Sequence, residues 1–428
     1  TEAQKEANLS ALNIIKMILV DIYDMAGWWS LVVALQVVFI SSYYVYSRNK
    51  SRKYVSSSNG QLVDWDPAPL VEQDIEVEEP PLIDDKVLNV GATSFLGLDK
   101  DESVVNSALE CMDKYGVGSC GPRAFYGTID VHLSLEERLA SFLEVEETCV
   151  YSYGFSAISS AIPAYVKRAD IIFADENVWF AIQKGIQASR STVRYFKHND
   201  MTDLERQLSE AAKKKELNPR RRAFIIAEGI YYNTGEMCPL RQLVKLARQY
   251  KLRIMLDESL TIGVVGKHGR GITELLDIPR DEIDLIMCSL EHSFATAAIS
   301  ALDIIQQRPH IIHELNEISN KMNKALSKLK HFTFRGDALS PIKHIYLTRD
   351  LTVQLKQTYL CNITRYCLEK GIAMTTAAYL RDDEANCPEP SIRLAASRKL
   401  TDEHVQQIID LLDEAFEAVG PQPDMVAV

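Results

Sequence analysis

The sequence predicts an α/β protein with a large, mostly parallel sheet, a small C-terminal α+β part and an N-terminal transmembrane helix. Three observations lead to this prediction. From Leu88 onward, short apolar runs alternate with longer amphipathic stretches, which is typical of a sheet covered by helices. After about Ala297 the pattern changes to two long helices followed by mixed strands and helices. Residues 27–45 contain no charged residue over about 19 positions, close to the length of a membrane-spanning helix.

The N-terminal segment divides into three parts. In residues 1–26, apolar side chains recur at helical spacing, which predicts an amphipathic helix lying on a membrane or on a partner protein. Residues 27–46 form the expected transmembrane helix. Acidic residues precede this helix and basic residues follow it, so the positive-inside rule places the larger C-terminal part in the cytosol, in a single-pass arrangement. Residues 47–86 are expected to be a linker, acidic and proline-bearing from Ser56 onward. A buried core helix is the alternative interpretation of the apolar run.

Residues 87–296 are expected to form the large domain. The expected strands are Cys149–Tyr153, Asp170–Ala174, Val193–Phe196, Ala223–Ala227, Arg253–Asp257 and Leu285–Ser289. The expected helices are Leu133–Phe142, Ser156–Tyr165, Trp179–Ala188, Met201–Ala212 and Leu240–Tyr250. Helices between successive strands require parallel pairing.

Residues 297–428 are expected to form the long helices and the small C-terminal domain. Strands are expected at His344–Leu347 and Ser391–Ala396, and helices at Gln354–Lys370 and Asp402–Ala418.

Composition excludes several function classes. The 428 residues carry a net charge of −12 and no long basic stripe, which argues against nucleic-acid binding. The eight cysteines form no CxxC pair and no cluster with zinc spacing, so reduced thiols are expected and no metal site is predicted.

Three local motifs, taken in order, carry a family resemblance. A glycine-rich turn at Tyr115–Thr128 leads into a helix, Ala227–Gly229 ends a strand before a loop, and Leu256–Gly263 ends a strand in an acidic residue before a second glycine-rich loop. In this order and spacing they resemble the α-oxoamine synthases. The resemblance implies the fold-type I PLP-transferase fold and a reaction that condenses an amino acid with an acyl-CoA.

The resemblance also implies which positions would hold pyridoxal phosphate (PLP). A PLP enzyme needs a lysine for its internal aldimine, but the matching position is His292. Asp257 matches the aspartate that binds the pyridine nitrogen, although a structural carboxylate at a strand end is the alternative. Trp179 stands at the ring-stacking histidine and Tyr232 at a phosphate-binding serine, and Leu260 replaces a further family histidine. No cofactor-binding or catalytic residue is therefore expected in this chain.

A sequence with the motifs of this family but without its cofactor-binding residues is similar to the non-catalytic long-chain-base subunits of serine palmitoyltransferase. That resemblance implies a subunit of an enzyme that condenses L-serine with palmitoyl-CoA to 3-ketodihydrosphingosine in sphingolipid synthesis at the endoplasmic reticulum membrane. The implied partners are the catalytic second long-chain-base subunit, which would hold PLP, a small activating subunit, an ORM-type regulator and membrane lipid. An active homodimeric PLP-dependent acyltransferase and a membrane adaptor that kept only the fold are the alternatives.

The remaining candidates lie near the implied shared active site. Cys120, Gly121, Arg123 and Tyr126 belong to the glycine-rich turn, and Cys120 is interpreted equally as a pocket-lining residue and as a small buried filler. Arg393 matches a family arginine that holds the substrate carboxylate, and a structural ion pair is its alternative role.

Two further expectations concern positions near these candidates. His132 and Glu136 fit a helix-start pattern and are expected to be packing and capping residues. Family members carry an additional stretch where Thr296 runs directly into Ala297, so we expect the sequence to lack a segment there and a shorter one near residues 82–86.

Overall fold

A computed structural model describes most of the chain after residue 86. The described residues are Gln36 and 87–118, 121–217, 221–291, 298–381 and 383–420. The chain divides into two compact units, Thr1–Pro81 and Leu82–Val428, and the second is the subject below. The segments expected as amphipathic helix, transmembrane helix and linker lie outside the described residues apart from Gln36, as do Thr296, Ala297 and residues 82–86. In the described part of the chain, no helix is both long and apolar enough to cross a membrane.

The central sheet has five parallel strands in the order β3-β2-β4-β5-β6. The strands are β2 (Ile171–Asp175), β3 (Thr192–Phe196), β4 (Ala223–Glu228), β5 (Arg253–Asp257) and β6 (Leu285–Met287). Every residue of β2 and β4 is buried, because helices cover both faces of the sheet. The predicted parallel sheet is thus confirmed for five of its six expected strands.

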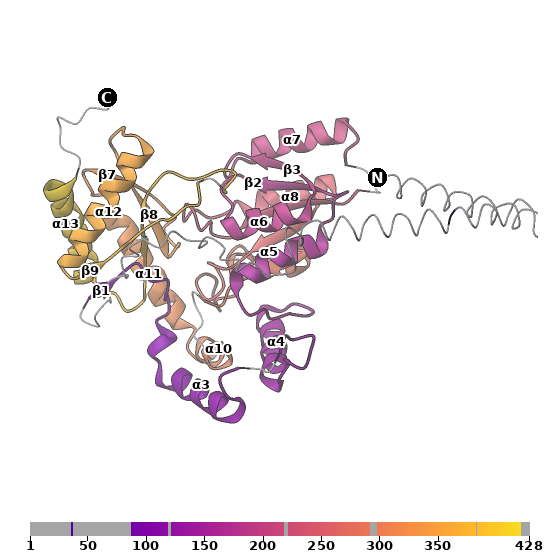
Figure 1. The fold of residues 1–428 in the computed structure, drawn as a ribbon, viewed down its shortest axis with the longest axis horizontal. Coiled ribbons are helices and arrows are strands. Elements are labelled where there is room, and N and C mark those ends of the chain that lie inside the picture. Colours follow the sequence, from indigo (N-terminus) through magenta and orange to yellow (C-terminus); the bar gives the residue numbers. More distant parts are fainter. Residues whose placement is uncertain are drawn as a thin grey trace, which may run out of the picture. The chain divides into compact units, whose positions relative to one another are not determined.

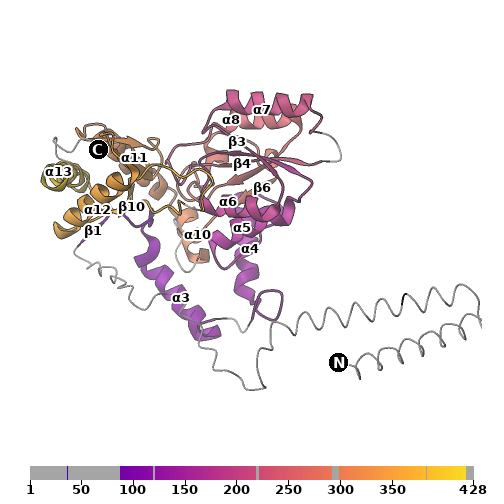
Figure 2. The ribbon, with the colours of Figure 1, turned by 45° about the horizontal axis from the view of Figure 1, so that its top comes forward.

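Helices on the two faces alternate with these strands along the chain. Figures 1 and 2 show α5 (Gly154–Tyr165) and α6 (Phe180–Ser189) on one face, and α7 (Met201–Lys213) and α8 (Leu240–Tyr250) on the other. In α8 the apolar residues recur at helical spacing and are buried. Short helices α9 (Ile272–Leu275) and η2 (Arg280–Glu282) connect β5 to β6.

The expected strand Cys149–Tyr153 is wrong, because the segment has no regular structure. The Val150 amide donates to the Glu136 carboxylate at 2.8 Å, and its carbonyl accepts from Arg123 at 3.2 Å. Both backbone groups of Val150, at the centre of the first half of this segment, are therefore satisfied by side chains instead of by a neighbouring strand. Apolar composition alone does not distinguish these two outcomes.

A second group of elements forms the C-terminal lobe. Its antiparallel sheet has the order β10-β11-β8-β7, and a two-stranded parallel sheet joins β1 to β9. The strands are β1 (Leu88–Asn89), β7 (Phe332–Arg335), β8 (Ile342–Leu347), β9 (Ile372–Ala373), β10 (Thr375–Thr376) and β11 (Ile392–Ala395). The helices are α10 (Ala298–Gln307), α11 (His310–Leu326), α12 (Val353–Glu369) and α13 (Asp402–Val419). The helices and the two strands expected after residue 297 are thereby confirmed.

Helices α3 (Glu102–Tyr115) and α4 (Asp130–Leu143) both contact α10, and a 3-10 helix η1 (Leu98–Lys100) precedes α3. Asp101 caps α3 by accepting from the Ser103 amide. In α4, the His132 ring nitrogen accepts from the Ile129 amide at 3.2 Å, which confirms its expected capping role. The sequence prediction contained no element at α3.

Candidate functional site

The candidate site lies at the carboxyl edge of the central sheet. Asp175 ends β2, Glu228 ends β4 and Asp257 ends β5, and the side chains of all three are buried. Parallel strands bring their carboxyl ends to one edge, which is where open α/β sheets bind ligands. The fold therefore gathers three carboxylates that are far apart in the sequence.

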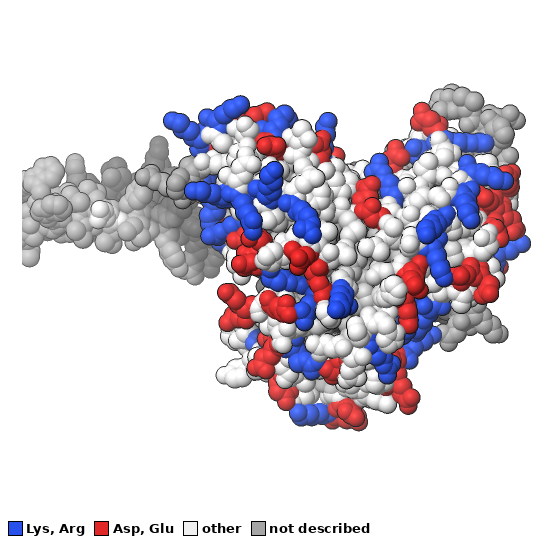
Figure 3. Space-filling model, turned by 180° about the vertical axis from the view of Figure 1, so that it is seen from behind, with Lys and Arg blue, Asp and Glu red and all other residues white. Residues whose placement is uncertain are grey.

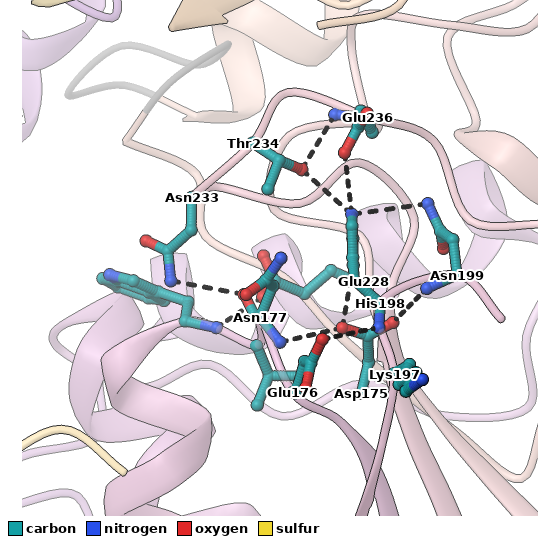
Figure 4. A network of polar contacts seen from close by, with 12 residues as sticks. Asp175, Glu176, Asn177, Lys197, His198, Asn199, Glu228, Asn233, Thr234 and Glu236 are labelled. Carbon is teal, nitrogen blue, oxygen red and sulfur yellow. Dashed lines mark hydrogen bonds and ion pairs between the residues drawn. The ribbon is translucent and has the colours of Figure 1, made fainter. Parts of the chain in front are cut away.

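His198, just after β3, occupies the centre of a polar network at this edge (Figure 4). Its Nδ1 lies 2.8 Å from Asp175 Oδ1 and its Nε2 lies 2.9 Å from Glu236 Oε2. Burial alone lowers the pKa of His198, but the hydrogen bonds to Asp175 and Glu236 outweigh it and raise the pKa to about 9. The charged imidazolium therefore ties the end of β2 to the loop after β4.

Glu228 holds two aromatic residues in place. One carboxylate oxygen accepts from the Trp179 amide at 2.5 Å and the other accepts from the Tyr232 amide at 2.9 Å. Burial raises the pKa of Glu228 well above its usual value, and the charge of Asp257 adds to this effect. The two aromatic rings lie 5.4 Å apart between centroids.

Asp257 retains one unused hydrogen-bonding atom. Its Oδ1 accepts from the Ser259 amide at 2.8 Å, whereas its buried Oδ2 has no hydrogen-bond partner among the described residues. Burial raises the pKa of Asp257 to about 6. A carboxylate in this state fits a cofactor's pyridine nitrogen, and it equally fits a structural residue.

Tyr232 and Arg393 contact each other across the gap between the central sheet and the C-terminal lobe. Arg393, on β11, donates from Nη1 to the Tyr232 hydroxyl, and its guanidinium carbon lies 5.1 Å from the ring centroid. The carboxylate-binding arginine of the resemblance thus contacts a tyrosine, and no ion pair of Arg393 is found in the described residues.

His344, on β8, completes this contact. Its Nε2 donates to the Tyr232 carbonyl at 2.9 Å, so its Nδ1 accepts from the Ser391 hydroxyl, also at 2.9 Å. Burial lowers the pKa of His344 to about 4, which keeps the ring neutral and this tautomer in place. Tyr232 is therefore fixed by Glu228, His344 and Arg393 together.

These residues fit PLP only in part. Asp257 has a free oxygen and the Trp179 indole can stack on a ring, but a phenol occupies a phosphate position and already holds Arg393. Leu260 is a buried apolar side chain, and Lys267 is exposed in the glycine-rich loop. No lysine within the described ranges is hydrogen-bonded to Trp179 or Asp257. His292 lies outside the described residues.

The glycine-rich turn forms a second, separate group. Arg123 pairs with Glu136 at 2.6 Å, and Glu136 is thus a structural anchor for this turn as well as for Val150. Gly127 allows a close approach, because a Cβ there would lie 1.7 Å from the Gly121 carbonyl oxygen. Tyr126, next to Gly127, is 99% exposed and has a φ of +59°. Cys120 lies outside the described residues.

No described hydrogen bond or ring contact joins this turn to Trp179, Asp257 or Arg393. The structure thus brings together Trp179, Asp257 and Arg393 at the carboxyl edge of the central sheet. It leaves Gly121, Arg123 and Tyr126 on a separate, exposed turn. Sequence reasoning missed Glu228, His198 and His344. Glu228 ends an apolar strand just as Asp257 does, so strand-end position was an available signal for it. His344 lies inside β8 and not at its end, so strand-end position did not mark it as a site residue.

Comparisons with known proteins identify the relatives of this chain. The family model "Aminotransferase class I and II" matches residues 85–323. Long chain base biosynthesis protein 1b of Oryza sativa subsp. japonica is 33% identical over 404 residues, covering 83% of this chain and 84% of the relative. Serine palmitoyltransferase 1 of Dictyostelium discoideum is 32% identical over 392 residues, covering 82% of each.

Solved structures share the fold. The structure of SPT with PLP internal aldimine superposes with a TM-score of 0.67 at 19% identity, covering 78% of this chain and 88% of that one. The expected fold-type I α/β fold with a parallel sheet is thereby confirmed.

Proposed function

Because the chain belongs to the class I and II aminotransferase family and, within it, to the serine palmitoyltransferase 1 and long chain base biosynthesis protein 1 group, we propose that it is a non-catalytic serine palmitoyltransferase subunit. The enzyme would condense L-serine with palmitoyl-CoA to 3-ketodihydrosphingosine, the first step of sphingolipid synthesis. The catalytic second long-chain-base subunit would hold PLP, and this chain would stabilise it and complete the shared site.

The observation that carries the proposal is the contact between Tyr232 and Arg393. In the α-oxoamine synthases that the sequence resembles, the matching arginine binds the substrate carboxylate. Here its Nη1 donates to the hydroxyl of Tyr232, whose backbone is held by Glu228 and His344. A substrate carboxylate would have to displace this phenol to reach Nη1, although the buried Nε has no hydrogen-bond partner among the described residues.

An exposed apolar surface supports a partner subunit. Eleven of the fourteen exposed large apolar side chains in the described residues lie between Val105 and Tyr165. They include Leu109 and Met112 on α3 and Tyr126 on the turn. Large exposed apolar patches on soluble domains mark interaction sites. The partly buried ion pair between Arg123 and Glu136 restrains the turn, which lowers the entropy cost of binding.

Co-expression with the catalytic subunit tests this function. The purified pair should condense serine with palmitoyl-CoA. The chain alone should show no activity, and it should lack the absorbance at about 420 nm that the internal aldimine of a PLP enzyme gives. An aldimine band in the isolated chain, abolished by substitution of a single lysine, would instead establish the active homodimer. If no lysine-bearing homologue co-purifies with the chain, the remaining interpretation is a membrane adaptor that kept only the fold.

Location and regulators belong to the same proposal. The sequence supports an endoplasmic reticulum membrane protein whose residues 27–46 cross the bilayer once, with the α/β part in the cytosol. The small activating subunit and the ORM-type regulator would bind the N-terminal segment. Deleting residues 1–53 should then weaken regulator binding more than condensing activity, and equal losses of both would contradict this assignment.

A further inference from the structure

Basic side chains gather at the amino edge of the central sheet, opposite the candidate site. This basic edge consists of Arg168, Arg190, Lys213, Lys214, Lys251 and Arg253, all of which are exposed. Arg168, Arg190 and Lys251 closely precede β2, β3 and β5, Arg253 begins β5, and Lys213 and Lys214 lie at the end of α7, the helix that leads to β4; the four strands are neighbours in the sheet. Strands lie about 4.8 Å apart, so the group spans roughly 15 Å. Figure 3 shows Lys and Arg side chains gathered over the upper left of the lobe that carries this sheet.

Within the part of the chain that the structure describes, few carboxylates pair with the cations of the basic edge. Nearby carboxylates are occupied by other cations, since Asp170 pairs with Arg222 and Glu216 pairs with Arg194. Within the described ranges, Arg253 alone of the six has a recorded carboxylate contact, 4.0 Å from Asp284. Lys114, Lys321 and Lys356, on other surfaces, each pair with a carboxylate. The concentration of cations is notable in a chain of net charge −12.

Two of the six residues have a backbone conformation in which another residue type would have a lower conformational energy. Arg190 and Lys251 are the C-caps of α6 and α8 and have φ values of +54° and +57°. Glycine or asparagine is favoured in this conformation. Attraction to the helix C-termini explains part of the preference for cations. It does not explain the exposed cations before β2, at Arg168, and at the start of β5, at Arg253.

We infer that the basic edge lies against the anionic surface of the membrane that anchors the complex. This inference rests on the proposed function, which makes the chain part of a membrane-bound enzyme. An edge formed by several strand beginnings suits an extended surface of headgroups, and each cation near such a surface strengthens binding roughly fivefold. Tyr165, an exposed aromatic residue at the end of α5 beside Arg168, is of the type that favours the membrane interface.

Tethering makes such weak contacts effective. The expected linker of residues 47–86 would confine the domain near the bilayer, so docking becomes an intramolecular step at high effective concentration. The acidic remainder of the chain would be repelled by the same surface, which favours one orientation with the basic edge toward the lipid.

Hydrogen–deuterium exchange on the full complex in nanodiscs tests the inference. Amides of Lys214, Lys251 and Leu252 make backbone hydrogen bonds, so their exchange is slow enough to follow. Discs with about one third phosphatidylinositol should slow exchange in residues 213–217 and 250–253 on the order of threefold relative to phosphatidylcholine discs. High salt should remove the difference, because it screens surface charge.

Matched charge reversals provide the control. The triple variant Lys213→Glu, Lys214→Glu, Lys251→Glu should lose the lipid-dependent slowing, whereas Lys324→Glu, Lys328→Glu, Lys330→Glu on the C-terminal lobe should keep it. Equal exchange in both kinds of disc, or slowing that survives the first variant, would overturn the inference. Protection that does not depend on lipid charge would show that a protein covers the edge. Condensing activity measured on the same samples tests the proposed function separately.

Discussion

At the scale of single residues, Tyr232 makes contacts that determine which groups at the carboxyl edge are available to a ligand. Its amide, carbonyl, ring and hydroxyl each have a different partner, namely Glu228, His344, Trp179 and Arg393. A serine at this position would leave Arg393 unpaired and the space beside Trp179 open.

Tyr232→Phe should destabilise the chain without changing its fold. The phenyl ring keeps its contact with Trp179, but Arg393 loses a hydrogen bond in a partly buried position. Bonds to charged groups contribute about 2 kcal/mol, so we expect a loss of that order in the free energy of urea unfolding. Tyr366→Phe is the matched control, because its hydroxyl donates to Glu414 at an exposed site. A loss no larger than in this control would contradict the role given to Tyr232.

His198 should make stability depend on pH. Its pKa is about 9 in the folded chain and near its ordinary value of 6.5 when unfolded. The unfolded state therefore releases the proton first as pH rises. The stabilisation is fully present below about pH 6.5 and is lost as pH rises through about 9, a change of roughly 3 kcal/mol.

The difference between wild type and His198→Gln measures this contribution. The gap in unfolding free energy should narrow steadily from about pH 6.5 to 9. A gap that stays constant across this range would show that His198 is not held charged by Asp175 and Glu236.

At the scale of elements, α3 and the glycine-rich turn present apolar side chains that the fold leaves exposed. Val104 is the buried residue of α3, whereas Leu109 and Met112 are about half exposed. The turn adds Tyr126 in a left-handed conformation, which is costly for a non-glycine residue. Neither feature stabilises the isolated chain, so both are better explained by a partner.

Leu109→Glu with Met112→Glu should separate partner binding from folding. Because both side chains are exposed, the unfolding free energy should change by less than about 1 kcal/mol. Co-purification with the catalytic subunit should fall at least tenfold, since interface cores exclude charge. Leu355→Glu, on the exposed side of α12, is the matched control and should leave co-purification intact. If both variants co-purify with the catalytic subunit equally well, α3 is not part of the interface.

At the scale of the whole molecule, the chain shares its α/β fold with solved structures that contain PLP. Asp257 ends β5 at the carboxyl edge of this fold, with a buried oxygen that has no hydrogen-bond partner among the described residues and a pKa raised to about 6. Above that pH the folded chain must bury a charge that the unfolded chain exposes to water. Asp257 therefore opposes folding near neutral pH.

Asp257→Asn in this chain should stabilise it and leave the complex active. The amide still accepts from the Ser259 amide but carries no charge, so we expect a gain on the order of 2 kcal/mol at pH 7.5 that disappears below about pH 4. Condensing activity of the co-expressed pair should be unchanged. A large loss of activity together with normal stability would show that this chain holds the cofactor after all.

The sequence by itself determined the order of the elements and the type of sheet. Buried parallel strands need continuous apolar runs, and intervening amphipathic helices are forced by parallel connections, so Ile171–Asp175 and Ala223–Glu228 were predictable from local pattern. The same reasoning failed at Cys149–Tyr153, where side chains of Arg123 and Glu136 replace a neighbouring strand. The residue types at positions 179 and 232, which differ from those of the family that the sequence resembles, were also visible in the sequence.

Only the tertiary structure decided how those residues are used. The pairing of Tyr232 with Arg393 joins residues 161 positions apart, and no local pattern encodes a contact between two sheets. The buried network around His198 and the exposed basic edge likewise arise because parallel strands bring distant segments to two opposite edges. Local composition determines which elements form, whereas the partners and charges of their ends depend on which ends the fold brings together.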